Sequence, residues 1–322
     1  MNRSQSLPHK EPSKSITRHL TELWNQRDVQ LMVLPGILLV IIFSYIPMYG
    51  LIMAFQDFRL GDTVGFSRWV GFGHFTMFFH SFDFWLIIRN TFVISLLKLA
   101  FGFPFPILLA LMLNEVRSAP FKRAVQTVSY LPHFISWVVI SGLVIDMLSP
   151  DGGTINHLLV AAGFIGEPIN FMGYPKYFWP IVVISDIWKE VGWNSIIYIA
   201  AIAAIDPELY QAADIDGAGR FRKAWHITLS GIKSTIVILL ILSVGGILNA
   251  GFEQIMLLTN NLRNTMVYDT STILDTYVFS VGISQMRYSY ATAVGAFKAV
   301  VSVLLLVIAN YAAQKISDES LF

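Results

Sequence analysis

The sequence predicts an all-α, polytopic membrane protein with six transmembrane helices, and three observations lead to this fold class. First, 55% of the 322 residues are hydrophobic and only 13% are charged, whereas a soluble domain carries roughly 25% charged residues. Second, the mean hydropathy is +0.60, so much of the surface is expected to face lipid. Third, six separate segments are apolar over the roughly 20 residues that a helix needs to cross a bilayer.

These six segments share an apolar composition and adequate length. They are about Leu31–Phe55, Trp85–Leu113, Val128–Leu148, Phe178–Ile205, Ser234–Leu258 and Ala291–Ala313. The second and fourth segments are longer than a span requires, which predicts tilt, kinks or short interfacial extensions. Within the second, the motif FGFPFP (Phe101–Pro106) predicts a bend because proline removes backbone donors.

The distribution of lysine and arginine predicts the orientation of the spans. With the N-terminus in the cytoplasm, thirteen of these residues fall in cytoplasmic segments, six in loops on the other side and three within spans. Cytoplasmic loops carry an excess of Lys and Arg, so both termini are expected in the cytoplasm. The net charge of +1 provides no broad basic surface for nucleic acid.

The predicted organisation is one membrane domain, residues 31–315, between two cytoplasmic tails. Residues 1–30 are polar for too long to be a secretory signal peptide, and residues 316–322 form a short second tail. None of the loops is long enough to be a separate folded domain. The sequence contains no cysteine, which excludes disulfides, thiolate catalysis and cysteine-ligated metals.

A polar segment, residues 206–233, separates the fourth and fifth spans on the cytoplasmic side. Asp206-Pro207-Glu208 predicts a helix start, because an acidic N-cap, a first-turn proline and a first-turn acid are each favourable there. Gly217 is expected to end this helix, and RFRKAWHITL begins a second short helix. Two interpretations stay open: a docking surface for another protein, or an interfacial turn anchored by tryptophan and lysine.

A polar and aromatic stripe follows one face of the fourth span at helical spacing. Interrupted only by Ile197, its members are Asp186, Lys189, Glu190, Trp193, Asn194 and Tyr198. A charge at bilayer depth costs roughly 2.5–3.5 kcal/mol, so this face is expected to look into protein or water. Such a wall suits sugars, whose hydroxyls need hydrogen bonds and whose C–H faces stack on rings. The alternative is an internal ion pair of Lys189 with Asp186 or Glu190.

Further polar residues lie within or beside the other spans. Asn249 and Glu253 share a face near the outer end of the fifth span and are further pathway candidates, although Glu253 alternatively extends outward to the membrane interface. Lys98 and Lys298 are isolated intramembrane cations. They are expected to bond helix ends or carbonyls, or alternatively to contact an anionic sugar.

No chemistry-bearing motif for an enzyme is evident. The phosphate loop G-x-x-x-x-G-K-[ST] is missing, so the chain is not expected to hydrolyse ATP. His133 has no second histidine at metal-binding spacing and is expected to be structural. No cofactor or metal is therefore expected on this chain.

The cytoplasmic segment resembles the EAA loop of ABC importer permeases. The resemblance rests on Tyr210, Gln211, Ala212, Ala213, Asp214, Ile215, Asp216, Gly217 and Ala218, followed by Phe221, Ile227, Thr228 and Leu229. It implies that the segment forms a coupling helix that docks into a cleft on a cytoplasmic ATPase. Two positions depart from the family pattern: Gln211 replaces the usual glutamate and loses its charge, and Ser230 replaces the usual proline.

The resemblance extends over most of the chain, including Leu109–Trp137, Ser185–Gly219 and Tyr290–Ser317. These segments resemble the branch of carbohydrate importer permeases that carries oligosaccharides released from polysaccharides, a branch that includes alginate importers. The resemblance implies the type I importer permease fold, in which five helices form half of a pathway and the first helix packs on a partner. It also implies a multi-pass subunit of the bacterial inner membrane.

The same resemblance implies several partners. They are a second permease subunit, two ATPases that bind ATP and Mg, and an extracytoplasmic sugar-binding protein. The branch usually pairs two different permeases, while a homodimer stays open. Two other functions also stay open: an ion- or proton-coupled secondary transporter that uses Asp186 or Glu190 as a proton site, and a membrane enzyme acting on lipid-linked sugar.

Overall fold

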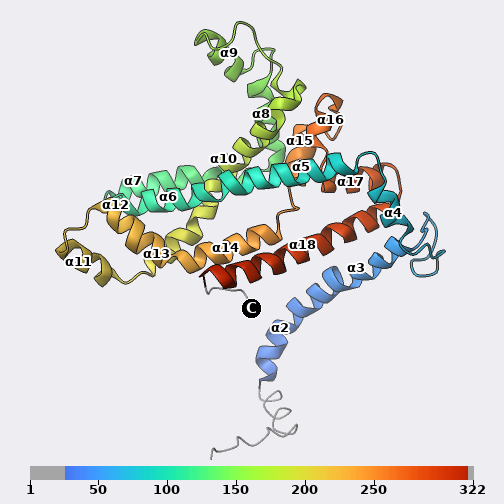
Figure 1. Ribbon diagram of the computed structural model, residues 1–322, viewed down its shortest axis with the longest axis horizontal. Helices are drawn as coiled ribbons and strands as arrows, with labels where there is room; N and C mark the ends of the chain where they lie inside the picture. Colours follow the sequence, from blue (N-terminus) through green and yellow to red (C-terminus); the bar gives the residue numbers. More distant parts are fainter. Residues whose placement is uncertain (1–25, 318–322) are drawn as a thin grey trace, which may run out of the picture. The chain divides into compact units, whose positions relative to one another are not determined.

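The computed structural model describes residues 26–317, and most of both predicted tails lies outside these residues. The regular structure of the described residues is helical, apart from an isolated antiparallel bridge between Gln56 and Trp69. Two compact units divide the chain between Ile52 and Met53. Figure 1 labels the helices along the chain.

The first unit contains the first predicted span. One helical segment runs from Arg27 to Phe55 and consists of α2 (Arg27–Val40), a π-helical stretch, α3 (Ile46–Met48) and a 3₁₀ stretch that ends just inside the second unit. The window of this segment with the highest hydropathy contains no buried residue. Its large apolar side chains are exposed, a surface that suits lipid or the apolar face of a partner subunit.

The second predicted span forms a single helical segment, Phe84–Glu115. It follows the short α4 (Gly73–Phe79) and comprises α5 (Phe84–Leu97), a π-helical turn over Lys98–Gly102, and α6 (Pro104–Glu115). The FGFPFP motif therefore produces a π-helical turn within a segment that continues beyond it. Pro104 occupies the first position of α6, where a missing backbone donor is tolerated.

The third predicted span is not one continuous helix, which corrects the prediction for Val128–Leu148. Helices α7 (Ala119–Tyr130) and α8 (Trp137–Leu148) are joined through a 3₁₀ turn and bend by 99°. Pro132 lies in this turn, where it lacks a donor for an α-helical bond. After α9 (Thr154–Ala161), the fourth span follows the prediction as the 29-residue α10 (Pro175–Ala203).

The fifth predicted span, Ser234–Leu258, is also interrupted. The chain passes through α11 (Pro207–Ile215), α12 (Arg220–Lys223) and α13 (Leu229–Gly231) into α14 (Lys233–Gly245), and α15 covers Phe252–Leu258. Residues 246–251 between α14 and α15 are not helical, and Gly251 has φ +101°. Non-helical backbone at membrane depth is tolerated where it lines a cavity, and this stretch does so.

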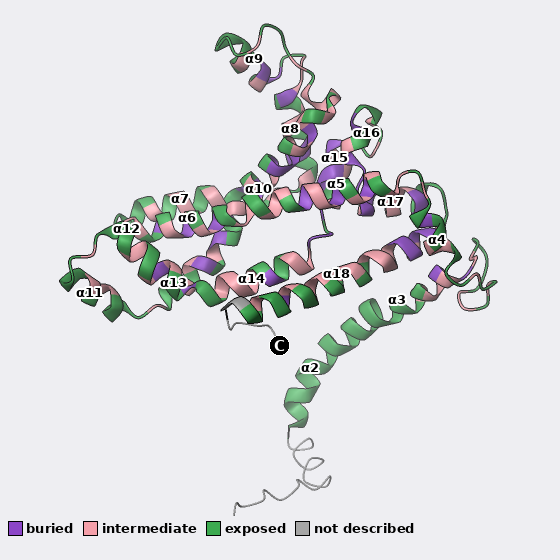
Figure 2. Ribbon diagram, viewed as in Figure 1, coloured by how far each residue is buried: buried purple, intermediate pink, exposed green. Residues whose placement is uncertain are grey.

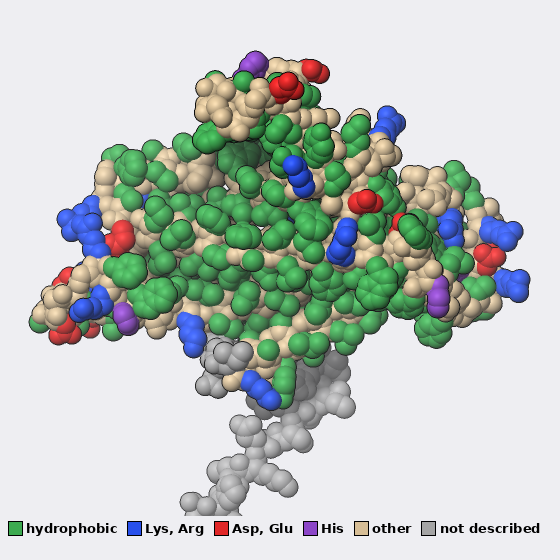
Figure 3. All heavy atoms as spheres, turned by 45° about the horizontal axis from the view of Figure 1, so that its top comes forward, with side chains coloured by type: hydrophobic (Ala, Val, Ile, Leu, Met, Phe, Trp, Pro, Cys, Tyr) green, Lys and Arg blue, Asp and Glu red, His purple; other side chains and the backbone are tan. Residues whose placement is uncertain are grey.

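The remaining helices complete the second unit. They are α16 (Tyr268–Ser271), α17 (Leu274–Phe279) and α18 (Tyr288–Ser317), which includes the sixth predicted span. By length and composition, the described chain has three helices able to cross a membrane, or up to six if each bent pair is one span. This range accommodates the six predicted spans. Figure 3 shows a face covered by hydrophobic side chains, with most of its charged side chains toward the two ends.

Helix α10 lies at the centre of the packing and contacts α5, α6, α7 and α14, while α14 packs on α18 and α15 on α8. Figure 2 shows that buried residues follow these contacts. Gly192 of α10 makes the contact with α7 possible, because a Cβ there would lie 1.9 Å from the Ser129 carbonyl oxygen. Along this bundle, α11 and α12 lie at one end, and α4 and α17 lie at the other (Figure 1).

The close approach at Gly192 leads to a testable prediction. Gly192→Ala forces α10 away from the backbone of α7, and overpacking of this kind typically costs about 1–3 kcal/mol. Thermal unfolding of the purified, detergent-solubilised protein is expected to show a lower midpoint. Gly142→Ala is the matched control, since nothing lies within 4 Å of a Cβ at that helical position. An equal loss in both variants would contradict the packing argument.

Candidate functional site

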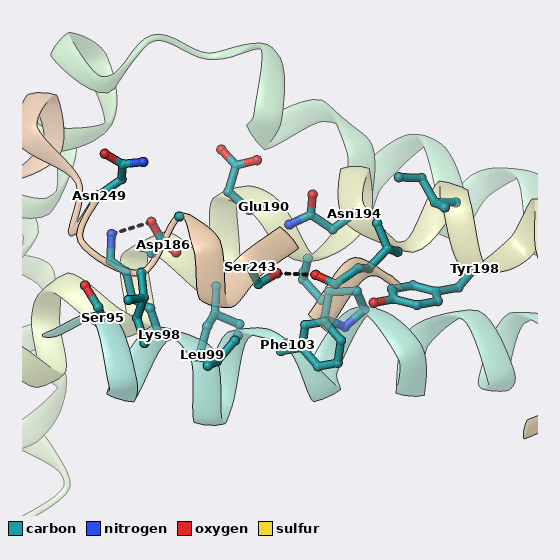
Figure 4. A pocket seen from close by; sticks show the side chains of 18 residues that line it. Ser95, Lys98, Leu99, Phe103, Asp186, Glu190, Asn194, Tyr198, Ser243 and Asn249 are labelled. Carbon is teal, nitrogen blue, oxygen red and sulfur yellow. Dashed lines mark hydrogen bonds and ion pairs between the residues drawn. The ribbon is translucent and has the colours of Figure 1, made fainter. Parts of the chain in front are cut away.

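A cavity of about 280 Å³ with both polar and apolar walls lies between α5, α10, α14 and the non-helical stretch after α14. Figure 4 shows charged, amide and hydroxyl side chains pointing into it from these elements. Its polar and aromatic lining consists of Ser95, Lys98, Phe103, Asp186, Glu190, Asn194, Tyr198, Ser243 and Asn249. The cavity combines hydrogen-bonding groups with aromatic rings, the two features that a sugar requires.

The structure brings together five of the eight residues predicted to line a pathway: Asp186, Glu190, Asn194, Tyr198 and Asn249. Within the described chain, neither the Asn194 amide nor the Tyr198 hydroxyl has a hydrogen-bond partner in the protein. These two groups are therefore available to a ligand. The other three predicted residues, Lys189, Trp193 and Glu253, do not line the cavity.

Lys98, in the π-helical turn after α5, forms hydrogen bonds to side chains of α10 and α15. Its ammonium group donates to Asp186 Oδ1 and to Gln254 Oε1, both at 2.7 Å. The buried Gln254 amide donates in turn to the Val182 carbonyl at 2.7 Å and to the Ser185 hydroxyl at 2.9 Å. The network thus connects the π-helical turn after α5, the middle of α10 and the start of α15.

The sequence did not predict this network. Lys98 and Lys298 were expected to bond helix ends or carbonyls, or alternatively an anionic sugar, whereas both bind side-chain carboxylate and amide oxygens. The two residues of the Lys98–Asp186 ion pair are 88 positions apart, and no local pattern connects them. The signal that could have suggested the pair is the cost of an isolated lysine at membrane depth, which requires a carboxylate nearby. Lys98 also lies beside the Gly251 backbone, where a Cβ would approach its ammonium nitrogen to 2.7 Å.

Lys189 stabilises the sharp turn between α7 and α8. It is 6% exposed and donates to the carbonyls of His133 at 2.5 Å and Ile135 at 3.0 Å. Glu190 faces the same turn, since its Oε2 lies 2.8 Å from His133 Nδ1 and its Oε1 lies 3.6 Å from the Lys189 ammonium. The Lys189–Glu190 ion pair expected as the alternative is therefore present, together with bonds to carbonyls that the turn leaves unpaired.

Trp193 and Glu253 lie outside the cavity for different reasons. The Trp193 indole stacks on the His133 ring with centroids 4.4 Å apart and an interplanar angle of 1°. Glu253 is exposed in the first turn of α15, where a carboxylate is favoured by the helix dipole. His133 therefore has two partners within the protein, consistent with a structural role.

The third intramembrane lysine fixes the non-helical stretch. Lys298 on α18 donates to Asp275 Oδ1 at 2.5 Å and to Asn249 Oδ1 at 2.7 Å. Asn249 is consequently oriented by a cation while it lines the cavity. Across the described residues, no group of three or more His, Asp or Glu side chains could hold a metal ion.

The predicted coupling segment, residues 206–233, forms a braced loop at one end of the bundle. Asp206 Oδ1 accepts from the Glu208 backbone N–H at 2.9 Å, which confirms the predicted N-cap. Gly217 has φ +71°, and the amides of Gly217 and Ala218 bond the carbonyls of Asp214 and Ala213. This is the helix-ending arrangement that favours glycine, so the predicted end of the helix is also confirmed.

The two halves of this loop are tied together by side chains. Lys223 Nζ donates to Asp214 Oδ1 at 2.6 Å, and the Tyr210 hydroxyl lies 3.0 Å from the Thr228 hydroxyl. Tyr210, Ile227 and Leu229 are half-buried, so they brace the loop from within. Gln211, Ala212, Gly217 and Phe221 are exposed, and a shallow groove lies between Phe221, Arg222, Trp225 and His226.

Residues 102–318 match the sequence profile of the family described as binding-protein-dependent transport system inner membrane component. The polygalacturonan/rhamnogalacturonan transport system permease protein YteP of Bacillus subtilis (strain 168) is 48% identical over 305 residues, 95% of this chain and 93% of that protein. Protein LplB of the same organism is 45% identical over 325 residues, 99% of this chain and 100% of that protein.

Solved structures give a similar result. A chain of a bacterial ABC transporter involved in the import of the acidic polysaccharide alginate has a TM-score of 0.84 and 42% identity. The match covers 93% of this chain and 99% of that one. A chain of a bacterial alginate ABC transporter in complex with an alginate pentasaccharide-bound periplasmic protein has a TM-score of 0.85 and 41% identity. This match covers 94% of this chain and 100% of that one. The all-α fold of a type I importer permease is thereby confirmed.

The Lys98 network leads to a prediction about stability. Side chains of Lys98 and Asp186 are 14% and 23% exposed, and removing one partner of a buried pair typically costs about 3–5 kcal/mol. Lys98→Met is therefore expected to lower the free energy of unfolding by about 3 kcal/mol, measured by denaturant or thermal unfolding in detergent.

The double variant Lys98→Met/Asp186→Asn is the control for this prediction. It removes both charges and leaves no unpaired carboxylate, so its loss of stability is expected to be smaller than that of Lys98→Met. If the double variant lost as much stability as the single variant, the ion pair would not be the source of the effect.

Proposed function

The chain belongs to the family of binding-protein-dependent transport system inner membrane components, and we propose that it is the permease of an ATP-driven importer for oligosaccharides released from polysaccharides. The observation that carries this proposal is the similarity over nearly the whole chain to permeases of such systems. Two relatives are described as serving polygalacturonan/rhamnogalacturonan and alginate. Oligosaccharides of acidic polysaccharides, alginate-type ones among them, are therefore the proposed cargo.

The proposed place of the protein is the bacterial inner membrane, with both termini in the cytoplasm. The excess of Lys and Arg on one side of the predicted spans supports this orientation. The loop of residues 206–233 would then face the cytoplasm, and the end of the bundle with α4 and α17 would face outward. The family description also makes the protein a transport component rather than an enzyme.

We propose that this loop couples the permease to a separate ATPase. Its exposed small residues permit the close approach of another protein, and the ion pair of Lys223 with Asp214 links the two helical parts of the loop. The proposed assembly adds a second permease subunit of different sequence, two ATPases and an extracytoplasmic sugar-binding protein. ATP and Mg would bind to the ATPases, and this chain would hold no cofactor.

The proposed mechanism follows from the continuity of α10 and α11. The two helices meet at an angle of 70° across a break of a few residues, and α10 carries four of the eight polar residues that line the cavity. Closure of the ATPase pair would displace α11 and thereby tilt α10 between inward-open and outward-open states. Docking of the binding protein outside would bias the same equilibrium, as linkage requires.

The alternative of a proton-coupled secondary transporter is not favoured. The relatives are components of binding-protein-dependent and ABC transport systems. In addition, Asp186 is paired with Lys98, and Glu190 contacts both His133 and Lys189. Neither carboxylate is therefore an isolated group of the kind that a simple proton site would use.

Purification of the tagged protein from its native membrane tests this function. The proposal expects co-purification of a protein with a phosphate loop and of a second permease, both identified by mass spectrometry. A protein recovered alone, whose uptake activity follows the proton gradient while ATP is clamped, would overturn the proposal.

A substitution at Gly217 tests the coupling role of the loop. Gly217→Asp is strained because L-residues rarely adopt φ +71°, although its side chain would meet open space. Membrane insertion is expected to persist, while recovery of the ATPase and ATP-dependent uptake fall by tenfold or more (~1.4 kcal/mol). Gly219→Ala, in equally open space at φ −68°, is the control and should retain both; normal uptake by Gly217→Asp would refute the coupling role.

A second substitution tests the cavity. Asn194→Ala removes an amide that lines the cavity and has no partner in the protein, so the stability of the protein should be unchanged. Uptake of oligosaccharide by the reconstituted importer is expected to fall about tenfold. This is the effect of losing one hydrogen bond between neutral groups, at the upper end of its usual contribution. Glu253→Gln, outside the cavity lining, should leave uptake unchanged, and the reverse order of effects would show that the cargo passes elsewhere.

A further inference from the structure

A second polar cavity, of about 380 Å³, lies at the end of the bundle opposite the coupling loop. We call it the outer cavity, after the proposed orientation. It is formed where the start of α5 meets the chain from the end of α15 to the start of α18. Its size falls within the range of small-molecule sites, and the transport mechanism described above makes no use of it.

The lining of the outer cavity is dominated by hydroxyl and amide groups. They belong to Thr259, Asn264, Tyr268, Ser271, Thr272, Thr276, Tyr277, Ser280 and Gln285. Burial, and next the charge of Asp83, raise the pKa of Tyr268 above its ordinary value, and burial does the same for the pKa of Tyr277. Both phenols thus stay protonated, and the Tyr277 hydroxyl already shares a hydrogen bond with the Tyr290 hydroxyl at 3.0 Å.

Several of these groups have no partner within the protein. The Ser271 side chain belongs to a residue that is only 6% exposed, yet among the described residues no group bonds its hydroxyl. The half-buried Ser280 hydroxyl likewise has no partner in that part of the chain, whereas the Gln285 side chain is exposed. The Ser271 oxygen is not among the fully buried atoms that lack a partner, so it is open to the cavity and available to a ligand with hydroxyls of its own.

The cavity carries one charge of each sign. Asp83 lies near Tyr268 and Tyr277, while Arg287 lies over the Tyr290 ring at 4.7 Å and donates to the Met77 sulfur at 3.0 Å. Among the ion pairs of the described chain, none involves either residue. A carboxylate acceptor and a guanidinium donor that are not neutralised by each other suit the mixed donors and acceptors of a sugar.

Two segments at the edge of the outer cavity, residues 260–262 and Met286, have left-handed backbone conformations, and we call them its two lips. Asn260, Asn261 and Leu262 have φ values of +51°, +56° and +64°, and Met286 on the other lip has φ +56°. Left-handed conformations at residues other than glycine are costly, and they cluster at ligand sites. The first lip is held in place by bonds from the Asn261 and Arg263 amides to the Met256 and Thr259 carbonyls.

Helix α15 connects the outer cavity to the cavity within the bundle. Thr259 follows its last residue and lines the outer cavity, while Gln254 near its start bonds Lys98 at the inner cavity. Five residues of helix correspond to roughly 7–8 Å along the axis. A sugar chain held in the outer cavity would therefore lie within a few sugar units of the inner one.

We propose that the outer cavity is a subsite that binds one end of the cargo oligosaccharide before the chain moves to the inner cavity. The ligand class is a sugar residue, recognised through its hydroxyls by Asp83, Arg287 and Ser271. The proposal rests on the proposed function as an oligosaccharide importer, and it adds a binding site on the outer side.

Equilibrium binding to the purified importer complex, without ATP or binding protein, tests the proposal. The probes are trigalacturonate, a mannuronate trisaccharide and galactotriose. Arg287→Gln is expected to weaken the binding of the best probe about tenfold and Ser271→Ala about fivefold, the loss of one charged and one neutral hydrogen bond respectively. Because the Ser271 hydroxyl has no partner in the protein, Ser271→Ala should leave the thermal unfolding midpoint unchanged.

Arg263→Gln is the matched control, since Arg263 is exposed on the same segment but does not line the cavity. Equal affinity in the wild type, Arg287→Gln and Ser271→Ala overturns the subsite, and so does a wild-type complex that binds none of the probes. A loss of affinity for the sugar-free binding protein, with sugar affinity intact, would instead identify the cavity as a protein contact. The proposed function stands independently if the complex contains the ATPases and imports an oligosaccharide under ATP.

Discussion

The cost of placing charge within a membrane is the constraint on which the rest of this structure depends. Three lysines lie in or beside spans, and each is satisfied by carboxylates, amides or carbonyls at an irregular point of the backbone. Lys98 lies beside Gly251, Lys189 bonds the carbonyls of the turn after α7, and Lys298 holds Asn249. Irregular backbone and intramembrane charge thus stabilise one another, since each supplies the partners that the other lacks.

This arrangement explains why the cavity lies where it does. The interrupted stretches after α5 and α14 line the cavity between α5, α10 and α14, and the Lys98–Asp186 ion pair joins two of its walls. Asn194 and Tyr198 retain free hydrogen-bonding groups because the neighbouring lysines bind to other residues. The same helix, α10, continues through a sharp turn into α11. The polar residues of α10 and the proposed coupling loop are therefore connected by a short turn, and a displacement of α11 would act directly on α10.

The sequence predicted the elements that depend on local physics. The helix start at Asp206, the glycine end at Gly217 and the uninterrupted α10 agree with the structure, because caps and apolar length act over a few residues. The breaks in the third and fifth spans were not predicted, because hydropathy averages over Pro132 and over the glycines around residues 246–251. The partner of Lys98 was missed for a different reason: a contact across 88 residues depends on how helices pack. Helical spacing identified the stripe on α10 but could not separate Asn194, which faces the cavity, from Lys189, which faces a turn.

The chain contains no cysteine, so a single introduced thiol can report on the cavity most directly. The measurement is the labelling rate of Ser243→Cys, a residue of the cavity wall, by a membrane-impermeant maleimide added from either side of the reconstituted importer. If α10 couples ATP to an alternating pathway, the accessible side should change when ATP and the loaded binding protein are supplied together. Labelling from the same side at the same rate in every state would contradict the account of this chain as an ATP-driven importer subunit.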